Sequence, residues 1–430
     1  MGSLRAVVIG LGSAGDVHPN VGLALALRKR GHNVMFVGPA AFRSLARSVG
    51  LEFVGLLTEE EYYAAIRDPD LWHPVRSFSV VARRLILPAL RVIYSIIESN
   101  FEPGRTVVAA PGFAFGARIA QEKLGVPLAT VHLQPIMLRS AIRPGCFGFP
   151  NILGHLPRPI RKLYFRAADR FLIDGLLAAE TNAFRAELGL RPVRRFFDGW
   201  IHSPQQVIGL FPEWFAPPVP DWPSNVALTG FPLWDQRDLH SSSPELEEFL
   251  AAGDPPVVFT AGSAMVHAKQ FFRVSTEVCR DVGRRGLLLT QFPEQLPAVL
   301  PSGVRHFDYI PFSVVLPRCA ALVHHGGIGT TAQAIAAGLP QLVVPMSHDQ
   351  PDNAMRIRRL SIGDFILPKA YTKPRVIEKL DRLMSPAVRD NCLRRAADLA
   401  ACQSLEMAST LIEALATVKT GSPPSAVGPY

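Results

Sequence analysis

Residues 6–37, AVVIGLGSAGDVHPNVGLALALRKRGHNVMFV, decide the fold class. The apolar run Ala6–Ile9 predicts a buried strand, the glycine-rich run Gly10–Gly15 a tight turn, and Val17–Arg30 a helix. The run His32–Val37 then predicts a second strand. A strand, a helix and a second strand over about 30 residues form the βαβ unit of a parallel sheet.

The same alternation of apolar runs with helical stretches continues and restarts after a segment rich in proline and tryptophan. We therefore expect an α/β protein with two doubly wound, Rossmann-like domains that face each other across a cleft. The further strands are predicted at Thr106–Ala110, Leu128–Val131, Val257–Thr260, Gly286–Thr290, Val304–Asp308, Ala321–His324 and Gln341–Pro345.

Length and composition agree with two domains. The chain has 430 residues, about three times a typical domain. Apolar residues make up 48% of it and charged residues 19%, which excludes a disordered or fibrous protein. We predict an N-terminal domain at 1–235, a linker at 236–254, a C-terminal domain at 255–418 and a flexible tail at 419–430.

Charge and cysteine usage narrow the class of protein. Lys and Arg number 45 against 36 Asp and Glu, a net charge of +9. This charge favours an anionic partner without choosing among nucleic acid, nucleotide, anionic lipid and acidic substrate. The five cysteines include no Cys-x-x-Cys pair, so we expect neither a disulfide framework nor a structural zinc site. With no predicted signal peptide or membrane span, we expect a cytoplasmic location.

The strongest local motif is His324-His325-Gly326-Gly327-Ile328-Gly329-Thr330-Thr331, which follows a predicted strand and precedes the helix Ala332–Ala337. Glycines let the backbone approach a ligand closely, and free N–H groups at a helix start favour a phosphate. The imidazole of His325 and the hydroxyls of Thr330 and Thr331 could add donors. A tight turn without a ligand is the alternative interpretation.

A second polar cluster, Ser347-His348-Asp349-Gln350-Pro351-Asp352-Asn353, follows the predicted strand at Gln341–Pro345. Polar side chains at the end of a parallel strand lie where such sheets bind ligands. Asp349 and Gln350 could bind sugar hydroxyls, whereas Asp352 is expected to cap the next helix.

These motifs carry a resemblance to a known family. The segment Tyr309–Asn353 resembles the donor-binding signature of family 1 glycosyltransferases, enzymes of the GT-B fold that use nucleotide-diphosphate sugars. The loop Gly12-Ser13-Ala14-Gly15-Asp16-Val17-His18-Pro19 resembles the acceptor-side loop of bacterial and sterol-type members. Segments such as Asp221-Trp222-Pro223 and Gly230-Phe231-Pro232-Leu233 resemble the rhamnosyltransferase group of rhamnolipid synthesis, whose B subunit attaches rhamnose from dTDP-rhamnose to a hydroxy-fatty-acid dimer.

The resemblance implies a role for each donor-side residue. Tyr309 would stack on the base, and the backbone of Ile310 would read the edge of the base. Gln333 takes the place of a glutamate that binds the ribose hydroxyls in many relatives, which leaves uridine and thymidine donors both open. The diphosphate and the sugar would be held by Gly262, Ser263, His325, Gly326, Gly327, Gly329, Thr330, Thr331, Asp349 and Gln350.

Asp16 is the candidate catalytic base. Glycosyl transfer needs the acceptor hydroxyl to be deprotonated as it attacks the anomeric carbon. Local sequence alone favours Asp16 as the N-cap of the following helix, whereas the resemblance favours the base. A helix N-terminus stabilises a carboxylate and weakens it as a base, so His18 is the alternative. Gly15 and His132 are predicted to line the acceptor side, although a satisfied core histidine explains His132 equally well.

The stretch Arg158–Leu177 combines basic and apolar residues. It could rest on an anionic membrane surface or receive an acidic lipid. We favour a solvated helix face that packs its apolar side inward. Association with a membrane therefore stays an alternative to a purely cytoplasmic location.

We predict an inverting, metal-independent hexosyltransferase, monomeric or homodimeric, whose acceptor is hydrophobic, such as a hydroxy-fatty acid. A nucleotide sugar, dTDP-rhamnose or a UDP-hexose, is its co-substrate, and no further cofactor or metal is expected. Asp68-Pro69-Asp70 matches the Asp-x-Asp pattern of metal-dependent transferases, but we discount it. The alternatives are a nucleotide-sugar epimerase and a non-catalytic nucleotide-sugar-binding subunit. Nucleic-acid binding ranks last, because no aromatic-basic module accompanies the charge.

Overall fold

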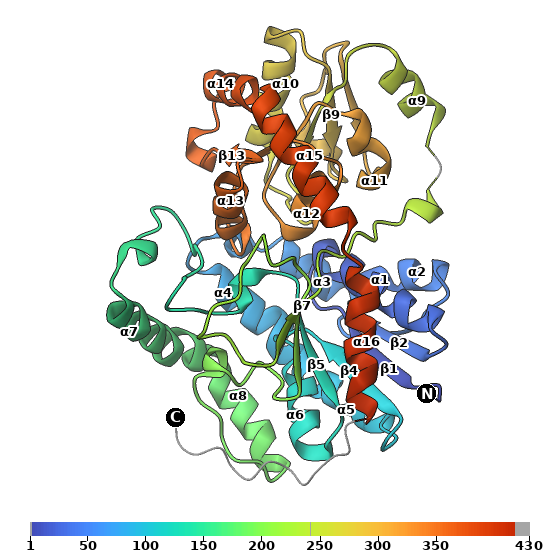
Figure 1. Cartoon of the computed structure of the whole chain (residues 1–430), viewed down its shortest axis with the longest axis vertical. Coiled ribbons are helices and arrows are strands. Elements are labelled where there is room, and N and C mark those ends of the chain that lie inside the picture. Colours follow the sequence, from blue (N-terminus) through green and yellow to red (C-terminus); the bar gives the residue numbers. More distant parts are fainter. Residues whose placement is uncertain (1, 241, 418–430) are drawn as a thin grey trace.

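The computed structural model describes residues 2–240 and 242–417 and contains two α/β domains, one above the other in Figure 1. The first sheet has seven parallel strands in the order β3-β2-β1-β4-β5-β6-β7. These strands are β1 (Arg5–Ile9), β2 (Asn33–Gly38), β3 (Glu52–Gly55), β4 (Thr106–Ala110), β5 (Leu128–His132), β6 (Gln206–Gly209) and β7 (Val226–Leu228).

The second sheet has six parallel strands in the order β10-β9-β8-β11-β12-β13. These strands are β8 (Val257–Thr260), β9 (Gly286–Leu289), β10 (Val304–Phe307), β11 (Ala321–His324), β12 (Gln341–Val343) and β13 (Gly363–Phe365). The predicted class, two doubly wound domains with parallel sheets, is confirmed.

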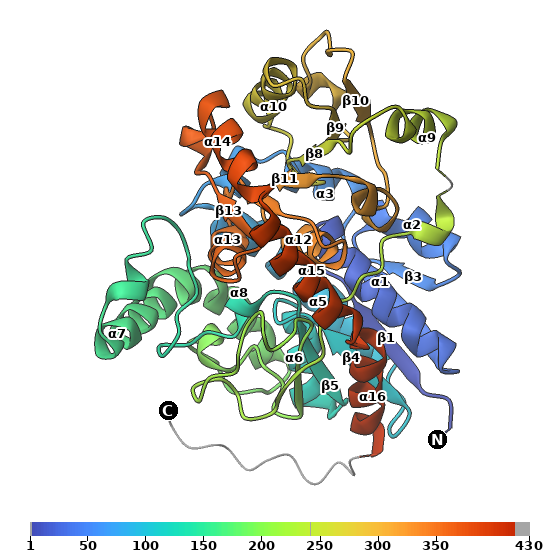
Figure 2. The same ribbon diagram turned by 45° about the horizontal axis from the view of Figure 1, so that its top comes forward.

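Helices cover the sheets of both domains (Figures 1 and 2). Those of the first half are α1 (Ala14–Lys29), α2 (Arg43–Ser48), α3 (Glu59–Ile66), α4 (Ser77–Val81), α5 (Leu87–Ser99), α6 (Phe115–Leu124), α7 (Arg158–Ala168) and α8 (Asp174–Glu187). Those of the second half are α9 (Pro244–Ala251), α10 (Lys269–Asp281), α11 (Phe312–Val315), α12 (Ile328–Ala336), α13 (Gln350–Arg359), α14 (Lys373–Leu383), α15 (Pro386–Ala400) and α16 (Ser404–Thr417). None of the described helices is both long and apolar enough to cross a membrane.

The strand β1 shows why its sequence is apolar throughout. Ala6 and Val8 belong to one buried cluster, and Val7 and Ile9 belong to another on the opposite face of the sheet. Successive side chains of a strand point to opposite faces, so a strand buried on both sides needs a continuous apolar run.

The topology places two loops where ligands bind. In the first sheet β1 lies between β2 and β4, and in the second sheet β8 lies between β9 and β11. The strand order reverses at these points, so the connections after the strands leave in opposite directions. The loops at the carboxyl ends of β1, β8 and β11 therefore border an open crevice.

One segment of the predicted division of the chain is not a plain linker, and another cannot be compared. The range 236–254, predicted as a linker, contains helix α9, because the Ser243 hydroxyl accepts the Leu246 N–H at 3.2 Å and Pro244 fits the first helical position. Leu246 and Phe249 are buried in the core of the second domain. The predicted tail at 419–430 lies outside the described residues.

The last helix returns to the first domain. Figure 1 shows α15 running down the second domain and α16 continuing onto the first, where α16 packs against α1, β4, β5 and β6. The predicted C-terminal range 255–418 thus includes a helix of the N-terminal layer. Glu413 of α16 accepts from Arg30 at 2.6 Å and lies 2.7 Å from Nε2 of His32.

We expect Glu413→Gln to lower the free energy of unfolding by about 1–2 kcal/mol at pH 7. The Arg30 guanidinium lowers the pKa of Glu413 from 4.5 to about 2, and this side chain is only 13% exposed. Because the folded-state pKa is depressed, this stabilisation is present above about pH 4.5 and is lost as the pH falls toward 2.

Urea denaturation at pH 7 measures the effect, and Glu406→Gln is the matched control. Glu406 pairs with the same Arg30 but is 46% exposed, so its loss should cost less than about 0.5 kcal/mol. Equal losses for the two variants would contradict the anchoring role of Glu413.

Candidate active site

A cleft of about 720 Å³ lies between the carboxyl edges of the two sheets. Its N-terminal wall is formed by the loops after β1, β4 and β5, and its C-terminal wall by the loops after β8, β9, β10, β11 and β12. Most of its lining side chains are apolar, with a few convergent polar groups. Both the size and the lining are typical of a small-molecule site.

The Asp16 carboxylate is held on the N-terminal wall by three donors. Its Oδ2 accepts from the Ser13 N–H at 3.0 Å and the Ser13 hydroxyl at 3.3 Å, and its Oδ1 accepts from the Gln134 amide at 3.2 Å. Ser13 is the N-cap of α1, so the helix begins at Ala14, and Asp16 occupies its third position instead of the expected cap.

Glycine at position 12 makes this arrangement possible. Gly12 has a φ of +135°, and a Cβ built there would lie 2.3 Å from Oδ2 of Asp16. Any other residue would be strained in the backbone and would push the carboxylate away from Ser13.

Burial controls the protonation of Asp16. Desolvation raises the pKa of Asp16 and outweighs the hydrogen bonds from Ser13 and Gln134, which lower it. The expected weakening of this base by the helix N-terminus is therefore overcome by burial. Asp16 is a stronger base than an exposed carboxylate.

The alternative base, His18, also lines the cleft but faces the chain that joins the domains. Its Nε2 lies 3.0 Å from the Gln236 amide nitrogen, and its ring meets Trp234 edge-on. Since the amide donates, Nε2 is an acceptor that already has a partner. Burial lowers the pKa of His18 to about 4.

His325 fills a space on the C-terminal wall that two glycines leave open. A Cβ at Gly262 would lie 2.8 Å from its ring, and a Cβ at Gly327 would lie 2.5 Å from its Nε2. Its Nδ1 is buried and has no hydrogen-bond partner among the described residues. Burial lowers the pKa of His325 to about 4, so the ring is neutral at pH 7 and can donate one hydrogen bond.

The structure brings nearly all predicted donor-side residues to this wall. Gly326 and Thr331 are the exceptions. Gly326 makes the turn after β11 with a φ of +95°, where a Cβ would meet Val343 at 2.6 Å, and Thr331 lies beneath the helix start and is fully buried. The residues that do line the cleft are Gly262, Ser263, Tyr309, Ile310, His325, Gly327, Gly329, Thr330, Gln333, Asp349 and Gln350.

Asp349 and Gln350 begin helix α13, and Asp352 has a different role from the predicted cap. The Gln350 side-chain oxygen accepts from the N–H groups of Met346 and Ser347, which leaves its NH₂ group to offer to a ligand. Asp352 lies inside the first turn and accepts the Cys146 N–H at 3.0 Å, so it joins the two domains.

Tyr309 and Gln333 are tied to the same interdomain segment. The Tyr309 hydroxyl donates to the Asp235 carbonyl at 2.7 Å, and the Gln333 amide donates to the Leu233 carbonyl at 3.1 Å. These bonds fix both side chains on the cleft wall. Gln333 is left with its amide oxygen, a neutral acceptor.

The two walls face each other closely. A Cβ at Gly329, at the start of α12, would lie 3.9 Å from the carbonyl oxygen of Gly15. Burial and the Asp16 carboxylate together raise the pKa of Asp349 to about 7. The predicted acceptor loop and the predicted donor loop therefore belong to one site.

Sequence reasoning missed several residues of this site. Gln134 donates to Asp16, and Tyr62 lines the same cleft. His132 is buried, as one of the two expectations had it, and it also lines the cleft. Its Nε2 lies 3.0 Å from Nδ1 of His202. Gln134 follows β5 by two residues, so its place at the carboxyl edge of the sheet was a usable signal. His202 has no such signal, because it comes from a loop 70 residues away.

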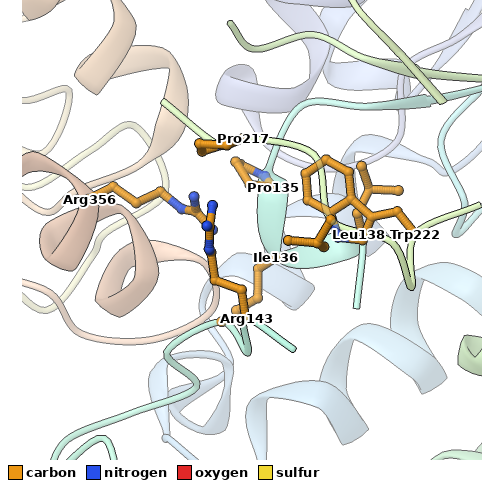
Figure 3. Close-up of a pocket in the computed structure, with 9 residues that line it drawn as sticks. Pro135, Ile136, Leu138, Arg143, Pro217, Trp222 and Arg356 are labelled. Carbon is orange, nitrogen blue, oxygen red and sulfur yellow. The ribbon is translucent and has the colours of Figure 1, made fainter. Parts of the chain in front are cut away.

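A second pocket lies beside the cleft and has only about 10 Å³. Figure 3 shows Arg143 and Arg356 pointing toward each other across it. The Arg356 guanidinium donates to Asp352 and to the Phe215 carbonyl, so its charge is already paired. The space holds no more than a water molecule. Within the described ranges, no group of three or more His, Cys, Asp and Glu side chains is arranged to hold a metal ion.

Two models of known protein families match this chain, one in each domain. Residues 288–414 match the family described as erythromycin biosynthesis protein CIII-like, C-terminal domain, and residues 6–142 match the glycosyltransferase family 28 N-terminal domain. The chain is 33% identical to O-mycaminosyltylonolide 6-deoxyallosyltransferase of Streptomyces fradiae, over 97% of this chain and 99% of the relative.

Solved structures share the fold at lower sequence identity. The glycotransferase of kitacinnamycin has a TM-score of 0.75 and 18% identity, with 96% of this chain and 100% of that chain covered. The glycosyltransferase VinC, solved with DTDP, has a TM-score of 0.69 and 19% identity, covering 96% and 99%. The chain therefore belongs to the family 1 glycosyltransferases of the GT-B fold and is a glycosyl-transferring enzyme.

Proposed function

We propose that this enzyme is an inverting, metal-independent transferase that moves a hexose from a nucleotide-diphosphate sugar to a hydroxyl of a hydrophobic acceptor. The observation that carries the proposal is that Asp16 and Asp349 line one cleft from opposite walls. A base on one wall and a sugar-binding carboxylate on the other are what a single displacement at the anomeric carbon needs.

In this mechanism Asp16 accepts the proton of the acceptor hydroxyl as its oxygen attacks the anomeric carbon. The bond between that carbon and the diphosphate oxygen breaks, and the diphosphate leaves with the electron pair. The first N–H groups of α12, at Ile328, Gly329 and Thr330, have no helical partner and would stabilise the developing charge. The neutral ring of His325 would add one more donor.

We infer that a dTDP-linked deoxyhexose is the favoured donor and a UDP-hexose the alternative. Gln333 offers a neutral amide oxygen where a carboxylate would bind both ribose hydroxyls. The relative from Streptomyces fradiae is named a 6-deoxyallosyltransferase, and VinC was solved with DTDP. Both names favour a thymidine-linked deoxysugar.

The acceptor is inferred from the lining of the cleft, which includes apolar side chains such as Leu71, Phe78, Phe113 and Phe197. Such a lining fits a lipophilic aglycone. A rhamnolipid precursor is one member of this class. An epimerase or a non-catalytic binding subunit has less support, because the relatives carry transferase names.

Asp16→Asn tests the proposed base. Asparagine keeps the shape but cannot accept a proton, so kcat should fall by about 10²–10⁴-fold. Binding of dTDP, measured by calorimetry, should stay within a few fold of wild type. The matched variant His18→Gln should lose less than about tenfold in kcat. The opposite ranking would make His18 the base, and equal activity of Asp16→Asn and wild type would exclude Asp16.

The pH dependence of kcat/KM tests the coupled carboxylates. Asp16 can accept a proton only when it is ionised, and its pKa is raised, so activity should fall on acidification at a higher pH than an exposed aspartate would give. The Asp16 charge helps to raise the pKa of Asp349 to about 7, so Asp349 ionises after Asp16. Asp349→Asn should therefore leave the acidic limb of the remaining activity in place, because Asp349 is protonated and uncharged while Asp16 titrates. A limb that moves to lower pH would show that Asp349 is already ionised when Asp16 titrates.

Thermal-shift measurements in buffer with EDTA test the donor site. A ligand that binds only the folded state raises Tm more the more tightly it binds, so at equal concentration dTDP should raise Tm more than UDP does. His325→Ala should abolish most of this shift, since one hydrogen bond to a charged group contributes about 1.5–3 kcal/mol. A larger shift with UDP would favour the UDP-hexose alternative. A need for added divalent metal would contradict a metal-independent site.

A further inference from the structure

Helix α7 and the π-helical turn Asp169–Ile173 after it carry an exposed apolar face. Leu163 is 66% exposed and Phe171 is 79% exposed, and Ile160 is exposed as well. Ile152, in the connection before α7, is also exposed. We expected this stretch to pack its apolar side inward. Only part of it does so, through side chains such as Phe165, and large apolar groups remain in water, which is unusual unless something covers them.

Four cations follow one another along the same segment at a spacing of four residues. Arg158, Lys162, Arg166 and Arg170 are exposed, and in the part of the chain that the structure describes none of them forms a salt bridge. The acidic residue of this segment, Asp169, is fully buried and neutralised by Arg139 at 2.7 Å. The surface is therefore apolar and positively charged.

This surface borders the cleft. Phe147, Tyr164 and Leu172 are exposed and also line the acceptor side of the cleft. Figures 1 and 2 both place α7 at the outer edge of the N-terminal domain, with the connection that precedes it beside it. The Arg161 guanidinium fixes that connection by donating to the carbonyls of Ala141, Ile142 and Gly154.

We propose that residues 142–172 form a docking surface for an anionic lipid bilayer. Leu163 and Phe171 enter the region below the head groups, and the four cations contact lipid phosphates. Charge complementarity selects this occupant, because an apolar protein partner would not need a row of unpaired cations. The contact is peripheral and places the mouth of the cleft against the bilayer. The entry of a lipophilic acceptor at this mouth rests on the proposed function. The docking itself does not rest on it.

Co-sedimentation of the full-length enzyme with vesicles tests the proposal without any substrate. Vesicles of equal parts phosphatidylcholine and phosphatidylglycerol should bind the enzyme, and pure phosphatidylcholine should bind it far less. Lys162→Glu/Arg166→Glu should weaken binding by at least about fivefold for each cation removed. Arg375→Glu/Arg389→Glu on α14 and α15 changes the net charge equally and should bind as wild type does.

The apolar contribution is tested by Leu163→Gln/Phe171→Gln, with Val299→Gln/Leu393→Gln as the control at exposed apolar positions elsewhere. The first pair should lose at least about tenfold in binding, and the control should lose little. All these side chains are exposed, so thermal melting should confirm folding. Absence of vesicle binding, or equal binding by all variants, overturns the proposal. Self-association that Leu163→Gln/Phe171→Gln abolishes, without vesicle binding, would assign the face to a second copy and overturn it too.

Discussion

The close approach of two glycine-rich loops is the constraint on which the cleft depends. The carbonyl of Gly15 faces the start of α12 at Gly329, where a Cβ would already be 3.9 Å away. Behind these loops, Gly12 gives room to Asp16, and Gly262 gives room to His325. A side chain at Gly12 or Gly262 would displace a functional group and not merely crowd the surface. The reactive groups can meet only because the backbone itself forms both walls.

Burial then decides the charge of every group in the cleft. It lowers the pKa values of His18, His132 and His325, so the histidines of both walls are neutral at pH 7. The same burial raises the pKa values of Asp16 and Asp349. One physical cause thus gives a carboxylate that accepts protons readily and imidazoles that act as uncharged donors. The hydrogen bonds that Asp16 accepts from Ser13 and Gln134 lower its pKa but do not reverse this effect.

Sequence patterns predicted those features of the fold and the site that interactions between neighbouring residues determine. Continuous apolar runs located most strands, and the loops after β1, β11 and β12 fell at the cleft as expected. Asp352 was mistaken for a cap because its partner, Cys146, lies 206 residues away in the other domain. Helix α16 was assigned to the second domain because nothing in its sequence encodes a return to the first. The outward apolar face of α7 was missed for a related reason, since periodicity shows that a face exists but not what covers it.

Keeping carboxylates in a desolvated cleft costs stability. Asp349 holds its proton up to about pH 7 in the folded enzyme but releases it near pH 4 when unfolded. The folded state therefore loses stability as the pH rises from about 4 to 7, where the enzyme needs its base ionised. Contacts that span the domains offset this cost without entering the cleft, among them Cys146 with Asp352 and the stacked rings of Phe149 and Phe365. These contacts hold the two walls of the cleft together. The closeness of the walls desolvates Asp16 and Asp349 and thereby raises their pKa values.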